Sequence, residues 1–256
     1  MENNSDSTHS LLSPKRWPRE AFPLGYSLLG LLGLGAILVL SLFVLLLGAR
    51  AFGLNLQHAD LAHVTPAETV ALFVLQDVAY VPVLLALFWG LPRLAKRSIE
   101  DFGLGTPTLR DLQRGLFTGL ITLVTVYVVS SLTDLITHQH HHQNELALFA
   151  NLDPLQTIIA CITAMVLAPF FEECIFRVLL FNLLLRYLPM GLAVFISAAL
   201  FGLAHGQLDV APVLAACGII FAVAYYRTGS FWTNYIAHAC LNGVTVIAIT
   251  VFHAQG

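Results

Sequence analysis

The chain has 256 residues, of which 57% are hydrophobic and 11% are charged, and its mean hydropathy is +0.79. Soluble domains carry about 25% charged residues, so this composition excludes an ordinary soluble domain and indicates an integral membrane protein. The formal net charge of −3, with no basic patch interleaved with aromatic residues, argues against a nucleic-acid partner.

The apolar runs are continuous rather than alternating, which favours membrane helices over a barrel and predicts an all-α, polytopic transmembrane bundle. Residues 1–23 form a polar N-terminal tail, and residues 24–150 form an N-terminal transmembrane region. The spans predicted in that region are Leu24–Gly48, Thr69–Leu91 and Gly115–Leu135.

Two polar features of this region each allow two interpretations. Asp77, inside the second span, either lines the bundle interior or hydrogen-bonds a neighbouring helix, and the second reading is favoured. The tract His138–His142 either binds a transition metal or forms a solvated turn. We favour the turn.

Residues 151–256 form a second transmembrane region. Its predicted helices are Leu155–Phe171, Cys174–Leu188, Met190–His205, Ala211–Tyr226 and Phe231–Phe252. These bring the expected total to about eight helices. Several are shorter than the roughly 20 residues that a perpendicular span needs, so tilted, fused or partial helices are expected.

Glu172, Glu173 and Arg177 lie inside this apolar sequence. A charge at membrane depth is costly and by default marks a functional site. Glu173 and Arg177 are four residues apart and can pair on one helix face. Glu172 is rotated by about 100° from Glu173 and is left free by that pairing. A purely structural ion pair is the alternative, but it would need only one glutamate.

Three further polar residues, His205, His238 and Asn242, follow in the same half. His238 and Asn242 share one helix face, with no other polar residue expected on that face nearby. If the chain turns at Glu172 and Glu173 on the cytoplasmic side, His205 returns to their level. The last helix then starts at the outer side, and His238 lies roughly 10 Å below its outer end. The residues can meet only in a site recessed into the membrane.

The motifs Glu172-Glu173-x-x-x-Arg177, Phe201-x-x-x-His205 and His238-x-x-x-Asn242 resemble those of the CPBP intramembrane proteases. That family includes the type II CAAX prenyl endopeptidases and the bacteriocin-processing or immunity (Abi) proteins. The resemblance covers about Leu155 to Phe252. It implies a helical bundle in a bacterial plasma membrane, in contact with lipid, that hydrolyses a peptide or protein substrate. Members of that family process prenylated tails, bacteriocin precursors or other proteins, and the resemblance does not select among them.

Amide hydrolysis in a membrane needs a water molecule that is delivered, deprotonated and aimed at a carbonyl. Glu172 is the expected general base, and His205 is expected to hold or share the water. His238 and Asn242 are expected to donate hydrogen bonds to the oxyanion. Arg177 is expected to neutralise Glu173.

Whether a metal takes part is left open by the residues. Glu172, His205 and His238 are candidate ligands of a divalent ion such as zinc, and a metal-free glutamate mechanism uses the same groups. Cys174 is rejected as a nucleophile because adjacent carboxylates and an apolar setting disfavour its thiolate.

Two other classes of function remain as alternatives. A non-catalytic immunity or membrane-partner protein would bind a peptide in the same cavity. An ion or metal transporter would use Asp77 and His138–His142, and would tolerate the loss of Asn242.

The distribution of lysine and arginine predicts the orientation. The N-terminal tail and the connection Arg93–Arg114 are rich in them and are predicted to be cytoplasmic, whereas His138–His142 is predicted to be outside. We expect a cysteine at position 139, Gln139→Cys, to react with an impermeant thiol reagent in intact cells. Labelling that requires cell lysis would contradict this orientation.

Overall fold

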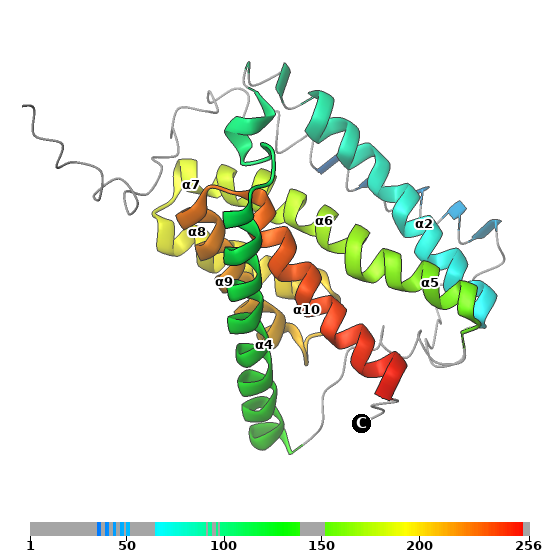
Figure 1. The fold of residues 1–256 in the computed structure, drawn as a ribbon. Coiled ribbons are helices and arrows are strands. Elements are labelled where there is room, and N and C mark those ends of the chain that lie inside the picture. The colour runs from blue at the N-terminus through cyan, green and yellow to red at the C-terminus, as the bar shows by residue number, and fades with distance from the viewer. Residues whose placement is uncertain are drawn as a thin grey trace, which may run out of the picture.

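The computed structural model describes residues 65–90, 92, 93, 96, 98–138 and 152–252, and scattered helical positions between 35 and 51. All regular structure in these residues is helical, as predicted (Figure 1). The elements are α2 (Pro66–Leu85), η3 (Ala86–Gly90), η4 (Ile99–Phe102), α4 (Leu109–Thr137), α5 (Pro154–Ile162), η6 (Thr163–Leu167), α6 (Ala168–Glu173), η7 (Cys174–Phe181), α7 (Asn182–Tyr187), α8 (Met190–Ala204), α9 (Ala211–Thr228) and α10 (Phe231–Phe252).

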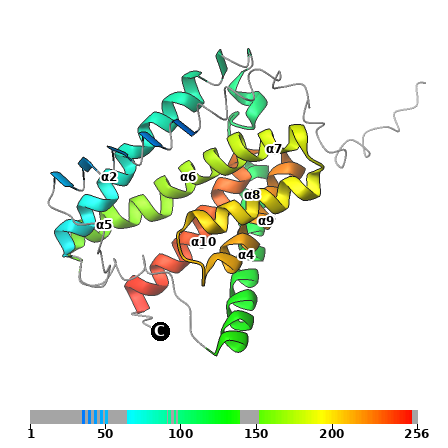
Figure 2. The same ribbon diagram turned by 180° about the vertical axis from the view of Figure 1, so that it is seen from behind.

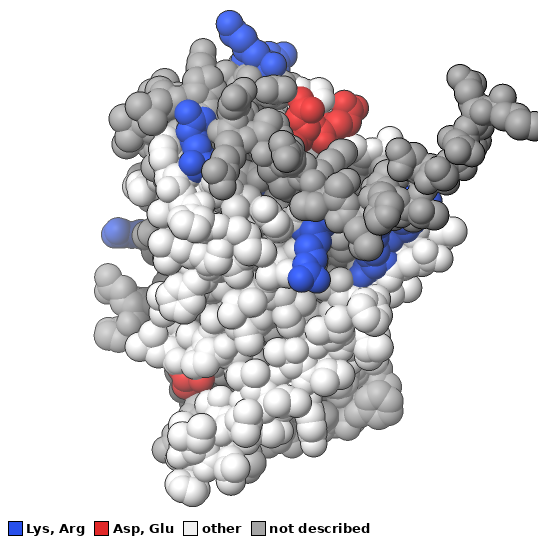
Figure 3. Space-filling model, turned by 90° about the vertical axis from the view of Figure 1, so that its left-hand side faces the viewer, with Lys and Arg blue, Asp and Glu red and all other residues white. Residues whose placement is uncertain are grey.

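Three of the described helices are long and apolar enough to cross a membrane: Leu109–Thr137, Pro154–Tyr187 and Ala211–Thr228. Most of the predicted span Leu24–Gly48 and nearly all of His138–His142 lie outside the described residues. Figure 3 shows lysine and arginine in the upper part of one face, above a broad surface that is almost uncharged. This surface has the character expected of a protein embedded in lipid.

The predicted helices Leu155–Phe171 and Cys174–Leu188 are one continuous helix of 34 residues, α5 to α7. The expected turn at Glu172 and Glu173 is therefore wrong. The segment contains no glycine and only one internal proline, Pro169, so nothing breaks the helix at the two carboxylates. At 1.5 Å per residue the helix is roughly 50 Å long. It exceeds the hydrocarbon thickness of about 30 Å, and it lies obliquely to α4 (Figures 1 and 2).

Because two predicted helices are one, the chain crosses the membrane one time fewer before α10. The direction of α10 is therefore the reverse of the predicted one. The backbone N–H of Phe231, at the start of α10, donates to the carbonyl of Gly103 at 3.0 Å. Thr233 Oγ1 donates to Asp111 Oδ1 at 3.3 Å, near the start of α4. Because α4 and α10 begin at the same end, His238 lies roughly 10 Å from the end that holds the Arg93–Arg114 connection. The predicted entry of His238 from the opposite end is wrong.

The end of the π-helix η6 leaves one backbone carbonyl without a backbone donor. Pro169 has no backbone N–H, and the N–H of Ala168 donates to the carbonyl of Thr163. Neither residue can therefore donate to the carbonyl of Ala164. Asn242 Nδ2, from α10, donates to that carbonyl at 2.9 Å. The proline thus creates a backbone acceptor that ties α10 to the long helix.

Two glycines let α8 and α9 approach closely and so position His205, the residue that follows α8. A Cβ atom at Gly202 would lie 2.4 Å from the carbonyl oxygen of Ala211. A Cβ atom at Gly218 would lie 2.9 Å from the Cα of Ala198. Both contacts are with backbone, so a side chain could be accommodated only by moving the helices apart.

We expect Gly202→Ala to separate α8 from α9 and to lower the stability of the fold by about 1–3 kcal/mol. Thermal melting of the purified protein in detergent measures the effect. Gly191→Ala is the matched control, because Gly191 lies in the same helix with no atom within 4 Å of an added Cβ. Equal melting temperatures for the two variants would show that the close approach is not required.

Candidate functional site

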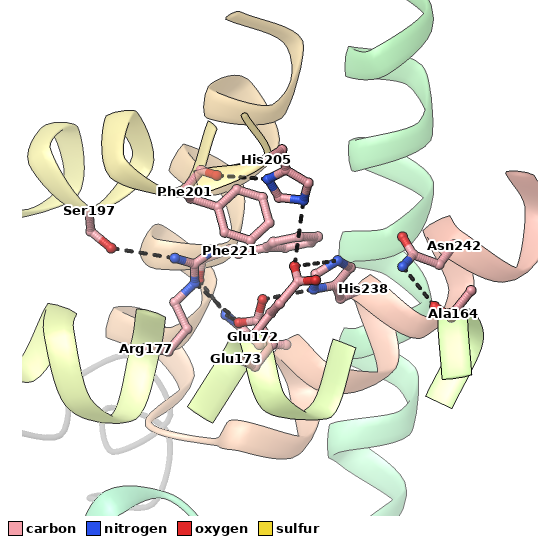
Figure 4. A network of polar contacts seen from close by, with 11 residues as sticks. Ala164, Glu172, Glu173, Arg177, Ser197, Phe201, His205, Phe221, His238 and Asn242 are labelled. Atoms are coloured by element: carbon pink, nitrogen blue, oxygen red, sulfur yellow. Dashed lines mark hydrogen bonds and ion pairs between the residues drawn. The ribbon is translucent and has the colours of Figure 1, made fainter. Parts of the chain in front are cut away.

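The centre of the site is the ion pair between Glu173 and Arg177, which lie one turn apart on the long helix (Figure 4). Arg177 Nε lies 3.1 Å from Glu173 Oε2, and both side chains are fully buried. The pairing predicted from their spacing is confirmed. A lone charge at this depth would be strongly destabilising, so each residue neutralises the other.

Side chains from two further helices surround Arg177. Its Nη1 donates to Ser197 Oγ on α8 at 3.4 Å. The guanidinium carbon lies 5.1 Å from the ring centre of Phe201 and 5.6 Å from that of Phe221. Such cation–π contacts stabilise a desolvated guanidinium, and they hold α8 and α9 against the long helix.

The Glu173 carboxylate is also bound from α10. His238 Nδ1 lies 3.0 Å from Glu173 Oε1, and Asn234 Nδ2 donates to Glu173 Oε2 at 3.1 Å. With Arg177, three donor groups converge on this one carboxylate. Glu173 therefore links α10 to the long helix and is fully occupied by structural contacts.

Glu172 points in a different direction and is paired with neither Arg177 nor Asn234. Its Oε2 lies 3.8 Å from His205 Nε2 and 3.7 Å from His238 Nε2. The Glu172 side chain is 19% exposed and that of His205 is 24% exposed, whereas His238 is 5% exposed. One of the adjacent carboxylates is thus sealed in the interior, and the other lies at an accessible edge beside two imidazoles.

The remaining contacts of the two histidines fix where their protons lie. His205 Nδ1 is 2.9 Å from the carbonyl oxygen of Phe201. A carbonyl can only accept, so Nδ1 carries the proton and Nε2 of the neutral ring carries a lone pair. The same reasoning applies to His238, whose Nδ1 faces the Glu173 carboxylate.

Three lone-pair atoms therefore converge: Glu172 Oε2, His205 Nε2 and His238 Nε2. Glu172 Oε2 is buried as an atom and has no hydrogen-bond partner among the described residues. Acceptors that face one another without a donor are unfavourable. The arrangement calls for a proton, a water molecule or a cation between them.

Asn242 is placed differently from the prediction. Its amide nitrogen is directed to the carbonyl of Ala164, away from Glu172 (Figure 4). Its role at an oxyanion stays a prediction that depends on the second N–H of the amide. Asp77 accepts a hydrogen bond from Thr163 Oγ1 at 3.0 Å, which is the interhelical role favoured from the sequence.

Two residues of the network were missed in the sequence. Asn234 lies four residues before His238, and Ser197 lies four residues before Phe201. The expectation that no other polar residue shares the face of His238 is wrong. A polar residue recurs every four positions at 234, 238 and 242, and this periodicity could have found Asn234. Ser197 had no such signal, because the position four residues after it is the apolar Phe201.

The donor atoms of Glu172, His205 and His238 have the chemistry that zinc requires. Bonds of about 2.0–2.1 Å in a tetrahedral site place ligand atoms roughly 3.3 Å apart, so the spacings here are somewhat wide. Within the described part of the chain, no three His, Cys, Asp or Glu side chains are close enough to be assigned to a cation. Metal ligation by these three residues stays a prediction.

We expect the two carboxylates to fail differently when each is replaced by glutamine. Glu173→Gln leaves Arg177 buried without an ionised partner and should cost about 3–5 kcal/mol of stability. Glu172→Gln removes no ion pair and should melt like the wild type. The double variant Glu173→Gln with Arg177→Met removes both charges and should recover part of the loss. Melting temperature and yield of folded protein are the readouts, and equal losses in both single variants would contradict this division.

Comparison with known proteins shows what this region is similar to. Residues 154–244 match the family model described as type II CAAX prenyl endopeptidase Rce1-like. The chain is 33% identical over 99 residues to "Putative membrane peptidase YdiL" of Bacillus subtilis (strain 168), covering 38% of this chain and 41% of that protein. It is 32% identical over 88 residues to "Membrane-embedded CAAX protease MroQ" of Staphylococcus aureus (strain USA300), covering 32% and 36%.

The matched part thus spans about two fifths of the length of these curated relatives. No solved structure matches the chain. The family match includes the glutamate pair, Arg177, both histidines and Asn242. The resemblance predicted from the three motifs is confirmed: residues 154–244 of this integral membrane protein match the Rce1-like family of type II CAAX prenyl endopeptidases.

Proposed function

We propose that the protein is an intramembrane endopeptidase that hydrolyses a peptide bond with a water molecule activated by Glu172. The observation that carries the proposal is the convergence of Glu172 Oε2, His205 Nε2 and His238 Nε2 as lone-pair atoms, beside the partly exposed side chains of Glu172 and His205. A water molecule between them donates one hydrogen to the carboxylate and the other to an imidazole. The names of the two relatives support a peptidase.

In the proposed reaction Glu172 takes a proton from this water as its oxygen attacks the peptide carbonyl carbon. A C–O bond forms and the carbonyl becomes a tetrahedral oxyanion. Glu172 then returns the proton to the leaving nitrogen as the C–N bond breaks. The products are a carboxyl group and an amine, and no covalent enzyme intermediate is needed.

The residues around Glu172 limit its freedom. Glu173 is held by Arg177, Asn234 and His238 and is not available as a base. Because Glu172 immediately precedes Glu173 on the same helix, the buried Glu173–Arg177 pair also fixes the direction of the Glu172 side chain. In the proposed mechanism, the second N–H of Asn242 donates to the oxyanion, a contribution of roughly 3 kcal/mol. His238 Nε2 carries a lone pair in this tautomer and accepts from the water, so the predicted donation from His238 to the oxyanion is not part of the mechanism.

A divalent cation is an extension of the same proposal. Glu172, His205 and His238 would hold it, and the hydrogen bond from His238 to Glu173 is of the kind that orients a metal-ligating imidazole. When bound, the ion would lower the pKa of its water. The zinc content of the purified protein, compared with that of His205→Gln, checks the ligation independently of activity.

Cleavage of defined peptides by purified protein in lipid nanodiscs tests the function directly. The substrate panel contains peptides ending in a prenylated cysteine, bacteriocin-type leader peptides and unmodified peptides, and mass spectrometry identifies the products. We expect an internal cleavage by the wild type and by Glu100→Gln, since Glu100 is exposed. We expect none by Glu172→Gln. Cleavage that survives Glu172→Gln would exclude Glu172 as the base.

Asn242→Ala separates two roles of one amide. Loss of an oxyanion donor should lower kcat by about tenfold to a thousandfold with KM nearly unchanged. Loss of the hydrogen bond to Ala164 should also cost about 1–3 kcal/mol of stability. Kinetics and thermal melting are measured on the same preparation. Lower stability with normal kcat would assign Asn242 to the helix contact alone.

A further inference from the structure

We propose that Asn234 is a positioning residue of the site, which holds the imidazole of His238 in its tautomer and in its plane. The proposal rests on the proposed function, in which His238 Nε2 faces the reacting water. The hydrogen bonds of Asn234 go to Glu173 and Phe221 rather than to Glu172 or His205, so it acts through Glu173 and Phe221. It precedes His238 by one turn of α10.

The contacts of Asn234 are few and fully buried. Its side chain has no exposed surface. Its Nδ2 donates to Glu173 Oε2 at 3.1 Å and to the backbone carbonyl of Phe221 at 2.6 Å. An amide nitrogen has two N–H groups, so both are used, one toward the long helix and one toward α9.

The first contact acts on the tautomer of His238. Glu173 binds His238 Nδ1 through Oε1 and accepts Asn234 and Arg177 at Oε2. The two donors at Oε2 restrict rotation of the carboxylate about its terminal bond and keep Oε1 directed at the imidazole. As long as Oε1 accepts from Nδ1, the proton stays there and Nε2 presents its lone pair to Glu172.

The second contact acts on the plane of the ring. The aromatic ring of Phe221 stacks on His238, with ring centres 5.0 Å apart and an interplanar angle of 29°. Asn234 binds the backbone of this same phenylalanine. One side chain therefore anchors both groups that define the orientation of the imidazole, its acceptor and its stacking partner.

An asparagine meets the two requirements of this position. It supplies two donors, and it adds no charge next to the Glu173–Arg177 pair. An aspartate of the same shape would place a second carboxylate beside Glu173 and would have no donor in its ionised form. An alanine would leave one fewer donor on each acceptor.

The test compares Asn234→Ala with Asn182→Ala. Asn182 is a second buried amide, whose Nδ2 donates to the carbonyl of Val178 at 3.0 Å and to Tyr225 Oη at 3.1 Å, in contact with none of the site residues. The full-length protein in detergent is labelled with 15N-histidine. The ring nitrogen signals of His238 are assigned by their loss in His238→Gln. Their chemical shifts report which nitrogen is protonated.

We expect wild-type His238 to be protonated at Nδ1, and Asn234→Ala to move its signals toward a mixture of tautomers while Asn182→Ala leaves them in place. Turnover should fall by about tenfold to a hundredfold in Asn234→Ala, as for other residues that orient an active imidazole, with KM little changed. Asn234→Asp, which keeps the shape and loses the donors, gives the same readout if the alanine variant does not fold.

Unchanged His238 signals in both Asn234 variants would overturn the proposal. So would an equal shift in Asn182→Ala, because that would assign the effect to general loosening of the fold. Absence of any cleavage by the wild type would contradict the proposed function alone, since the tautomer of His238 is measured without turnover.

Discussion

The buried ion pair between Glu173 and Arg177 is the constraint on which the rest of this half of the protein depends. Two full charges without solvent are tolerated only when they neutralise each other and when other protein groups contact them in place of water. Here that requirement recruits the neighbouring helices. Ser197 of α8 binds the guanidinium, Phe221 of α9 packs against it, and His238 of α10 binds the carboxylate.

The pair also explains how adjacent glutamates acquire different environments. On a continuous helix, consecutive side chains point about 100° apart. When Glu173 is directed into the interior by Arg177, Glu172 must face the edge where His205 and His238 present their Nε2 atoms. A break in the helix at this point would remove that relation. The 34-residue helix is therefore a functional feature of the site as well as a span.

Much of this site could be predicted from the sequence because it depends on local spacing. The Glu173–Arg177 pair follows from an interval of four residues, and the helix Phe231–Phe252 follows from its apolar run. The topology around the site could not be predicted the same way. Two carboxylates in an apolar sequence resemble a turn at a membrane surface, and only their burial against other helices shows that the helix continues through them.

Contacts between distant elements were also beyond the sequence. The hydrogen bond from Asn242 to Ala164 spans 78 residues of the chain. It depends on a carbonyl to which neither Ala168 nor Pro169 donates. The importance of Asn234 depends on the position of α9, whose carbonyl at Phe221 it binds. Such residues are recognised only when the packing of helices is known.

The most direct test of the central claim is an experimental structure of the protein in a lipid nanodisc, at a resolution that shows ordered water. The lone-pair atoms of Glu172, His205 and His238 call for a water molecule or a cation in contact with Glu172 Oε2 and at least one Nε2 atom. Density for such a species, with Glu173 still paired to Arg177, is the expected result. A site in which Glu172 instead pairs with Arg177, or in which a side chain or lipid tail fills the space between the three atoms, would contradict it.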